Sequence, residues 1–193
     1  MKSPEQRKRE LRKKVLSERQ QISEDIWREK SEKICTLFLE SEQYQQADFI
    51  HCYVSMNNRN EVNTWNLIRE MLAGNKKVAV PVTNFSETSL IHSTINSTEE
   101  LSPNKWGIYE PEEIETVDIQ KLDAVIIPMA AADRKGNRLG YGKGFYDRFL
   151  SQTEALKIGF VFSEFIFEEI PAADFDKKMD VLISEKGVIH PKH

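Results

Sequence analysis

The sequence predicts a single-domain α/β fold in which helices cover both faces of an open, mostly parallel sheet. Segments of helical and of strand character alternate along the chain, and most of the expected strands are near-continuous apolar runs. Runs of this kind are typical of parallel strands that are buried on both faces. A length of 193 residues suits one such domain, and no repeat or linker divides residues 1–193.

Two helices and a strand are expected at the start of the chain. Residues 4–20 are rich in Lys, Arg and Glu with a thin apolar stripe at helical spacing, and a second helix is expected over 23–41, capped by its first serine. The β-branched and aromatic run 48–55 predicts a buried strand. A helix over 61–73 follows, and Gly74 is a suitable C-terminal stop.

The rest of the chain continues the alternation. Further apolar runs predict strands at 76–82, 122–128, 157–163 and 179–184. Segment 88–95 alternates between apolar and polar residues without a long apolar run, so it is expected to be an antiparallel or edge strand. Residues 96–120 are polar and are expected to be irregular. The last helix is expected to end near Gln152.

Composition argues against several classes of protein. The net charge of −4 gives no general reason to expect binding to nucleic acid or to a membrane. Cys35 and Cys52 are isolated and the histidines are not clustered, which indicates neither a disulfide framework nor a zinc site. The N-terminus is too charged for a signal peptide, and no apolar run approaches the roughly 20 residues of a membrane span. The expectation is a soluble, cytoplasmic and monomeric protein.

The loop that follows the strand at 122–128 is the most informative stretch of the chain. It contains four of the eight glycines, Gly136, Gly140, Gly142 and Gly144, with the cations Arg134, Lys135, Arg138 and Lys143 between them. Closely spaced glycines let backbone amides approach a ligand, and a loop between a strand and a helix directs those amides at anions. The pattern predicts a phosphate site, and Asp133 and Asp147 indicate a metal ion bound with that phosphate.

This glycine loop matches neither of the two common phosphate-binding motifs. A Walker A loop requires G-x-x-x-x-G-K-[ST], but Asn137 stands in place of the first glycine and Gly144 in place of the hydroxyl residue. The dinucleotide motif G-x-G-x-x-G also fails, because residues 140–144 read G-x-G-x-G.

The string DRKGNRLGYGKGFYDR at 133–148 resembles the signature of the 5-formyltetrahydrofolate cyclo-ligases, which are also called methenyltetrahydrofolate synthetases. Shorter elements of this family occur in the family's order: K-x-x-L-R at 8–12, E-[IV]-x-T at 61–64, G-I-x-E-P at 107–111 and a late acid at Asp180. The resemblance therefore covers nearly the whole chain.

Three positions depart from the family's pattern. Met129 stands where the family often has glycine, and Ala132 replaces the usual phenylalanine before Asp133. Phe145 replaces the first tyrosine of a Tyr-Tyr pair, which removes a hydroxyl group. None of these changes removes a charge that the reaction obviously needs.

The resemblance implies an activity and a fold. Enzymes of this family convert 5-formyltetrahydrofolate to 5,10-methenyltetrahydrofolate with hydrolysis of ATP to ADP and phosphate, and Mg²⁺ accompanies the nucleotide. The formyl oxygen attacks the γ-phosphate to give an N5-iminium phosphate, and N10 then closes the ring as phosphate leaves. The implied fold is related to that of sugar-phosphate isomerases and CoA-transferase-like proteins.

The resemblance also implies roles for individual residues. ATP would be bound by Lys8, Arg9, Glu10, Leu11 and Arg12, and by Arg138, Leu139, Gly140, Tyr141, Gly142, Lys143, Gly144, Phe145 and Tyr146. The folate would be bound by Met56, Glu61, Tyr141, Gly142, Lys143, Gly144 and Phe145. Arg138 and Lys143 would act in catalysis by neutralising the transferred phosphoryl group, and Asp147 and Asp180 would hold Mg²⁺.

Several of these residues also have a purely structural interpretation. Asp147 in the first turn of a helix is favourable for the helix dipole alone, and Glu61 would equally favour a helix start. Asp180 in an apolar strand would be satisfied by a basic partner. Trp106 is expected in the core rather than at a ligand, and His51 is expected to be a packed histidine.

Two other functions are consistent with parts of the sequence. An isomerase or CoA-transferase-like activity would proceed without ATP and would need a dedicated carboxylate base, which the sequence does not single out. A non-catalytic RNA-binding module would use the basic N-terminal helix, but residues 1–20 contain no aromatic residue to stack on bases.

Overall fold

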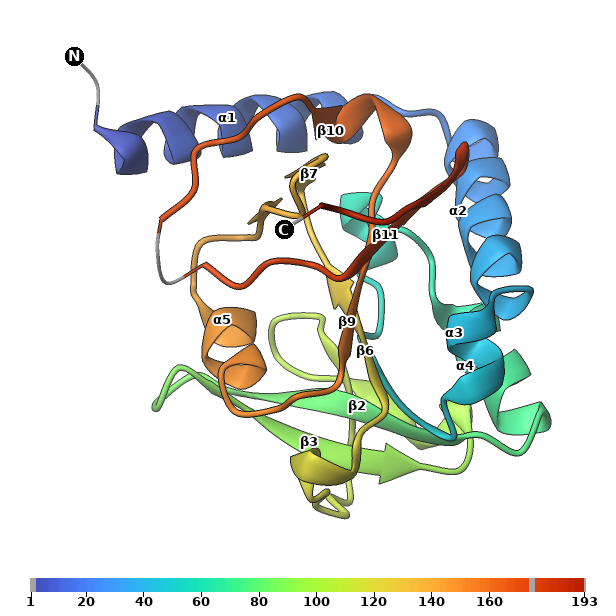
Figure 1. The fold of residues 1–193 in the computed structure, drawn as a ribbon. Coiled ribbons are helices and arrows are strands. Elements are labelled where there is room, and N and C mark those ends of the chain that lie inside the picture. Colours follow the sequence, from blue (N-terminus) through green and yellow to red (C-terminus); the bar gives the residue numbers. More distant parts are fainter. Residues whose placement is uncertain (1–2, 174–175, 193) are drawn as a thin grey trace.

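A seven-stranded sheet runs through the centre of the computed structural model, which describes residues 3–173 and 176–192 (Figure 1). Its strands lie in the order β12-β11-β9-β6-β1-β2-β3. Parallel pairing joins β11 (Val181–Ser184), β9 (Leu156–Phe160), β6 (Ala124–Pro128), β1 (Phe49–Cys52) and β2 (Lys77–Asn84). The edge strands β12 (Gly187–Ile189) and β3 (Ser89–Ile95) are antiparallel to their neighbours. The mostly parallel sheet and the antiparallel edge strand near 88–95 are therefore confirmed.

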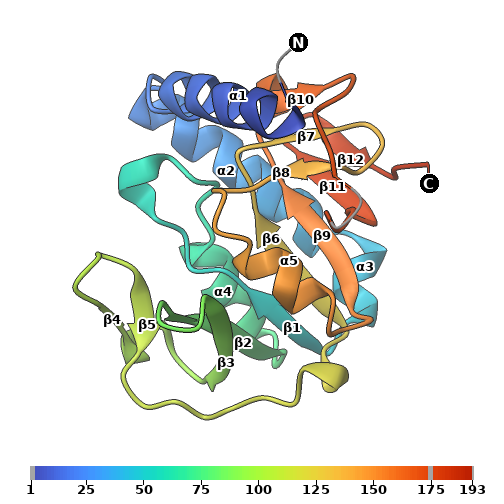
Figure 2. The ribbon, with the colours of Figure 1, turned by 90° about the vertical axis from the view of Figure 1, so that its left-hand side faces the viewer.

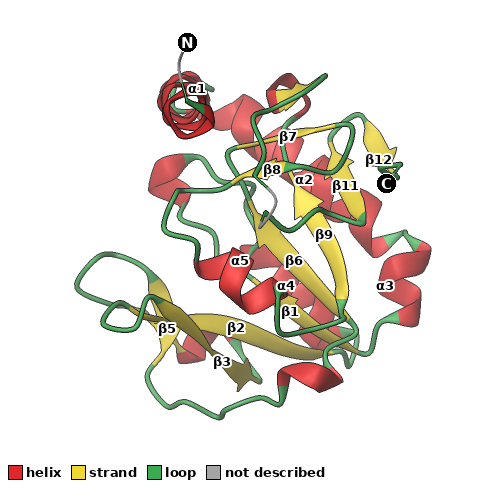
Figure 3. Cartoon of the chain, turned by 60° about the vertical axis from the view of Figure 1, so that its left-hand side comes forward, coloured by secondary structure: helices red, strands yellow, loops and turns green. Residues whose placement is uncertain are grey.

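Helices cover both faces of this sheet, as predicted. The α-helices of the described residues are α1 (Pro4–Arg19), α2 (Glu24–Leu39), α3 (Glu42–Gln46), α4 (Trp65–Ala73) and α5 (Phe145–Leu150). Figure 3 shows α5 in front of the sheet and α2 and α4 behind it. Every residue of β1 and β6 is buried, which explains why these strands are continuous apolar runs. Helix α1 crosses the end of the sheet at which β6 leads into β7 (Figure 1).

Helix α4 begins at Trp65, four residues later than predicted. Residues 61–64 are committed to contacts with the end of β1 instead of to a first helical turn. The Thr64 hydroxyl donates to the Tyr53 carbonyl (2.7 Å), and the Ser55 amide donates to the Thr64 hydroxyl (3.1 Å). The side-chain contacts of Thr64 thus delay the helix.

Short elements that the sequence did not predict fill the connections. Two small sheets are formed by β4 (Leu101–Pro103) with β5 (Tyr109–Pro111), and by β10 (Ile166–Phe167), β7 (Ala131–Asp133) and β8 (Arg138–Leu139). Single 3₁₀ turns lie at Asn57–Arg59, Thr98–Glu100, Ile119–Lys121 and Ser163–Phe165. The prediction of an irregular 96–120 was therefore wrong in part. Helix α5 ends at Leu150, slightly before the predicted end.

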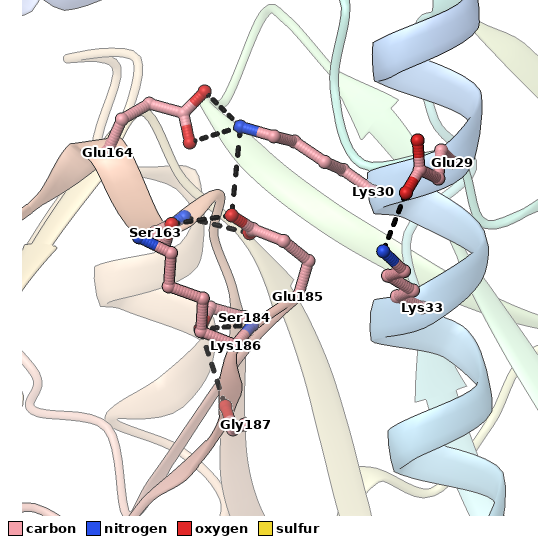
Figure 4. Close-up of polar contacts among 9 residues, drawn as sticks. All are labelled: Glu29, Lys30, Lys33, Ser163, Glu164, Ser184, Glu185, Lys186 and Gly187. Carbon is pink, nitrogen blue, oxygen red and sulfur yellow. Dashed lines mark hydrogen bonds and ion pairs between the residues drawn. The ribbon is translucent and has the colours of Figure 1, made fainter.

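A charged cluster ties α2 to the ends of β9 and β11. Figure 4 shows Lys30 of α2 between Glu164 and Glu185. The Lys30 Nζ atom lies 2.6 Å from each carboxylate oxygen of Glu164 and 3.7 Å from Glu185 Oε1. Glu185 also accepts the Ser163 amide at 2.9 Å. These contacts fix the chain where it leaves β9, close to the small sheet that carries the glycine loop.

None of the helices in the described part of the chain is both long and apolar enough to cross a lipid bilayer.

Two buried histidines contact each other beneath α5. His51 of β1 and His92 of β3 lie 3.1 Å apart, from Nε2 to Nδ1, and Phe149 of α5 stacks on His92 with ring centroids 4.0 Å apart. The interpretation of His51 as a packed histidine is thus confirmed. Burial lowers the pKa of His51 and lowers that of His92 to about 4.

This pair predicts a loss of stability in mild acid. The native state keeps both histidines neutral, whereas the unfolded chain takes up protons below the ordinary histidine pKa of about 6.5. The free energy of unfolding should therefore fall as the pH is lowered from about 6.5 to about 4, and His92 alone should account for roughly 3 kcal/mol. Urea titrations at stepped pH measure this fall.

The matched variants isolate the buried histidine. His92→Gln should show a shallower fall in stability over this pH range, and His190→Gln, at an exposed position, should match the wild type. Equal slopes in all three proteins would assign the acid sensitivity to other groups.

Candidate active site

The glycine loop lies beyond the end of β6, between the sheet and α1 (Figure 2). Open α/β sheets bind ligands at this edge, where the carboxyl ends of the strands meet. Gly142 adopts a φ of +89°, and a Cβ added there would lie 3.1 Å from the Arg12 guanidinium. A larger residue would therefore be strained and would push against Arg12. The loop backbone stays open to a ligand because this position is glycine.

Gly136 serves packing rather than ligand approach. Its carbonyl accepts the Met179 amide at 2.8 Å, and an added Cβ would lie only 2.7 Å from the Met179 carbonyl oxygen. Of the four predicted loop glycines, this one anchors the hairpin of β7 and β8 to the segment that precedes β11.

Asp133 shapes the same hairpin, and the hypothesis that it binds a metal ion is wrong. Its Oδ1 accepts the amides of Lys135 (2.9 Å) and Asn137 (3.0 Å). Its Oδ2 accepts the Asn137 side-chain amide (2.8 Å) and the Ile170 amide (3.1 Å). Asp133 is fully buried, so its carboxylate is committed to the turn.

Arg138 and Asp147 form an ion pair across the loop. Arg138 Nη2 lies 2.6 Å from Asp147 Oδ1, and the two side chains are 4% and 27% exposed. Arg138 Nε and the Tyr146 hydroxyl are buried and have no hydrogen-bond partner among the described residues. Unpaired buried donors are costly, so these two atoms fit a site that receives an anion.

The structure places the two predicted metal ligands in different surroundings. Asp147 lies in the first turn of α5 beside Arg138. Asp180 precedes β11 instead of lying inside it, and its Oδ2 accepts the Lys157 amide at 2.7 Å. Among residues 3–173 and 176–192, no group of three or more His, Cys, Asp and Glu side chains is arranged to hold a metal ion. A single carboxylate such as Asp147 suits Mg²⁺ that is held mainly by phosphate oxygens.

Helix α1 brings Arg12 against the glycine loop, where its Nε donates to the Gly140 carbonyl at 2.7 Å. Lys8, one turn earlier, is buried and forms an ion pair with Asp176 instead. Leu11 packs against the core, whereas Arg9 and Glu10 are exposed. The contacts of these five residues with ATP stay predictions.

A buried carboxylate lies on the other side of the loop. Glu61 is 3% exposed, and its Oε2 accepts the Met56 amide at 2.7 Å. Burial raises the pKa of Glu61, and the hydrogen bond from the Tyr141 hydroxyl opposes that rise. The structure thus brings together Met56, Glu61 and Tyr141, which the sequence assigned to the folate.

Arg19 was missed by the sequence analysis. It is 2% exposed at the end of α1, and its Nη2 donates to the Tyr141 hydroxyl at 3.0 Å. The signal lay in the spacing of Lys8, Arg12, Val15 and Arg19, which repeats every three to four residues and marks one face of a helix.

Other predicted residues lie at the rim. Lys143 is exposed, and its carbonyl accepts Arg148 Nη2 at 2.7 Å. Phe145 faces Phe85, with ring centroids 6.1 Å apart. Trp106 is 53% exposed and lies against Phe85 with ring centroids 4.0 Å apart, so its expected place in the core was wrong.

These contacts gather three kinds of group at one edge of the sheet. The glycine loop offers backbone amides, α1 and β8 offer cations, and the segment after β1 offers a buried carboxylate that stabilises hydrogen-bond donors on a ligand. Leu139 is buried beneath the loop and supports it. The arrangement can hold an anion such as a phosphate beside a second ligand that carries N–H groups.

Comparison with known proteins agrees with this geometry. The family model for the 5-formyltetrahydrofolate cyclo-ligase family matches residues 4–185. A probable 5-formyltetrahydrofolate cyclo-ligase of Schizosaccharomyces pombe is 30% identical, over 95% of this chain and 97% of its own. The solution structure of Aquifex aeolicus 5,10-methenyltetrahydrofolate synthetase superposes with a TM-score of 0.85 and 33% identity, covering 96% of this chain and 93% of the other. The 5-formyltetrahydrofolate cyclo-ligase of Escherichia coli is 30% identical over 66% of this chain and 74% of its own. The resemblance seen in the sequence is thus confirmed, and the chain belongs to the 5-formyltetrahydrofolate cyclo-ligase family, a family of ligases.

Proposed function

We propose that the protein catalyses the ATP- and Mg²⁺-dependent cyclisation of 5-formyltetrahydrofolate to 5,10-methenyltetrahydrofolate, with release of ADP and phosphate. The observation that carries the proposal is the single edge at which Arg12 contacts the glycine loop and Arg19 joins Tyr141 of that loop to the segment that carries Glu61. An anion site and a site for N–H donors are adjacent there, which suits a reaction between a nucleotide and a folate.

The chemistry explains the need for ATP. An N-formyl group is an amide whose oxygen leaves poorly, and phosphorylation turns that oxygen into a good leaving group. The formyl oxygen forms a bond to the γ-phosphorus as the bond to ADP breaks, which gives an N5-iminium phosphate. N10 then attacks the formyl carbon, phosphate leaves with the oxygen, and the N10 proton is released. The protein contributes mainly positioning and neutralisation of charge.

The nucleotide is assigned to the loop and to α1. Gly140, Gly142 and Gly144 would present backbone amides to the phosphates, while Arg138 and Lys143 would neutralise the transferred group. Lys8 and Arg12, one turn apart on α1, would reach one anion together. Arg138 Nε and the Tyr146 hydroxyl support this assignment, because they have no partner within the described part of the chain and a phosphate would supply the missing acceptors.

The metal ion is assigned to the same phosphates. Mg²⁺ would supply additional neutralisation of the phosphate charge, held by Asp147 and, as a second carboxylate, by Asp180.

The folate is assigned to the loop and to the segment after β1. Glu61 would accept hydrogen bonds from the amino group and the ring N–H of the pterin, and Met56 would lie beside it. Tyr141, Gly142, Lys143, Gly144 and Phe145 would lie where the two substrates meet. The buried position of Glu61 strengthens such bonds, since water does not compete for the carboxylate.

The two alternative functions, RNA binding and an isomerase-like activity, require different features of the protein. The RNA-binding alternative would use the basic N-terminal helix, but Lys8 is buried in an ion pair with Asp176 and Arg12 is half-buried against the Gly140 carbonyl, so these two charges do not point outward. An isomerase-like activity would need a carboxylate base, and Glu61 could serve as one. Dependence on ATP therefore distinguishes the two enzyme classes.

Replacing Asp147 with asparagine should raise the Mg²⁺ concentration for half-maximal rate by about tenfold, because one anionic ligand is lost. The measurement is a Mg²⁺ titration of turnover at saturating ATP. Asp25→Asn, which alters an exposed residue of α2, is the control and should behave as the wild type. Normal activity with an unchanged Mg²⁺ requirement in Asp147→Asn would remove Asp147 from the proposed metal site.

Isotope transfer tests the proposed chemical route. When the formyl group of 5-formyltetrahydrofolate carries ¹⁸O, the phosphate released in each turnover should contain that ¹⁸O, because the formyl oxygen attacks phosphorus. Mass spectrometry of the phosphate measures the label. Unlabelled phosphate with the label recovered in water would contradict the phosphorylated intermediate.

Two expectations from the sequence remain proposals, namely a monomeric state and a cytoplasmic location. Light scattering of the purified protein and cell fractionation test them. The cellular location differs among relatives, since the Arabidopsis thaliana relative is described as mitochondrial.

A further inference from the structure

One buried arginine touches all three segments that meet at the site. Arg19 Nη2 donates to the Tyr141 hydroxyl of the glycine loop (3.0 Å), and its Nη1 donates to the Met129 carbonyl at the end of β6 (3.2 Å). Its Nε donates to the Arg59 carbonyl (3.0 Å), two residues before Glu61. At 2% exposure the guanidinium is shielded from water, so these contacts hold it in one orientation.

The hydrogen bonds of Arg19 join the glycine loop to the segment that carries Glu61. An arginine can only donate, so the Tyr141 oxygen accepts from Arg19. The same guanidinium donates to the Arg59 carbonyl. Arg19 thus fixes the Tyr141 hydroxyl relative to the segment that carries Glu61.

The segment that carries Glu61 is fastened to the same end of α1. The Asn60 side-chain amide donates to the Arg19 carbonyl (3.2 Å) and to the Ile22 carbonyl (3.1 Å). The Trp27 indole N–H donates to the Glu61 carbonyl at 2.6 Å. Arg19 therefore joins the Glu61 segment, which Asn60 fastens to the end of α1, to Tyr141 of the glycine loop.

We propose that Arg19 is a positioning residue that couples the two substrate sites, so that each substrate binds more tightly when the other is present. This inference rests on the proposed function, which assigns the glycine loop to ATP and Glu61 to the folate. A folate on Glu61 orders the segment whose Arg59 carbonyl and Asn60 side chain bind Arg19, and Arg19 holds Tyr141 in the loop conformation that presents its amides to phosphate. Coupling of this kind is reciprocal.

Binding measurements without turnover test the coupling. The dissociation constant of adenylyl imidodiphosphate, with Mg²⁺, is measured by calorimetry with and without saturating 5-formyltetrahydrofolate. The wild type should bind the analogue about tenfold more tightly in the presence of the folate. In Arg19→Gln the ratio should fall to below about twofold, because the link through Tyr141 is lost.

A second variant and a control variant guard the coupling measurement against an unstable Arg19→Gln protein. Tyr141→Phe retains the ring but removes the linking hydroxyl, so it should lose the coupling even if Arg19→Gln proves unstable. Lys13→Gln removes a cation from the exposed face of the same helix and should keep the wild-type ratio. Thermal unfolding of each variant shows whether it is folded.

The outcomes separate this inference from the proposed function. Turnover of 5-formyltetrahydrofolate with ATP by a wild type that shows no coupling would overturn the role of Arg19 alone. A coupling ratio that survives in Tyr141→Phe, or that is lost equally in Lys13→Gln, would also overturn it. A wild type that binds neither the analogue nor the folate would overturn the proposed function and this inference together.

Discussion

Replacing Arg138 with alanine is expected to lower kcat/KM for ATP by about 10²–10³-fold, the range seen when one preorganised charge-stabilising donor is removed. Arg138 is 4% exposed on its side chain and pairs with Asp147 at 2.6 Å, and its buried Nε has no partner among residues 3–173 and 176–192. A donor held in this way is oriented before the ligand arrives. Charge that develops on the transferred phosphoryl group would therefore be stabilised without reorganisation. Steady-state kinetics with varied ATP measure the loss.

Two further variants make this result specific. Lys135→Ala removes a cation from the same loop, but its side chain is 57% exposed and pairs with Glu169 at 3.3 Å, so activity should stay near that of the wild type. Arg138→Lys keeps the charge and loses the fixed fork, so it should recover only part of the rate. Wild-type turnover in Arg138→Ala would remove Arg138 from catalysis.

Replacing Glu61 with glutamine is expected to raise KM for 5-formyltetrahydrofolate by about 10²-fold, because a buried charge-assisted hydrogen bond is worth roughly 1.5–3 kcal/mol. The carboxylate accepts the Met56 amide and retains capacity for donors on the pterin. The amide of glutamine would turn an NH₂ group toward one of these donors. KM for ATP at saturating folate should change much less.

The exposed residue Glu113 provides the control for this change. Glu113→Gln removes the same charge from the surface and should leave both KM values unchanged. An unchanged KM for the folate in Glu61→Gln would show that the pterin is bound elsewhere. Calorimetric titration of each variant with 5-formyltetrahydrofolate separates a loss of binding from a loss of rate.

The sheet could be predicted because its strands have a strong local pattern. The run 124–128 is apolar at every position and is buried on both faces, which leaves little ambiguity. The hairpin of β4 and β5 escaped prediction because each strand has three residues, too few for periodicity to show. The start of α4 was mispredicted because the Thr64 hydroxyl bonds to Tyr53 and Ser55, which follow β1 and lie nine to eleven positions earlier in the chain.

The candidate site, like the fold, could be predicted only in part. The glycine loop and the basic residues of α1 are visible in the sequence, and the structure brings them into contact through Arg12 and Gly140. The commitment of Asp133 to its own turn depends on four hydrogen bonds that composition does not reveal. The role of Arg19 depends on the meeting of α1, β6 and the glycine loop, which is a property of the fold.

Formation of 5,10-methenyltetrahydrofolate, followed by its near-UV absorbance, is the decisive experiment for the proposed function. Purified protein is mixed with 5-formyltetrahydrofolate and Mg²⁺, with ATP or without it, and ADP is quantified in parallel. Product should form strictly with ATP, and one ADP should appear for each product molecule. Product formed equally well without ATP, or a folded protein that binds ATP and forms no product, would contradict the proposed function.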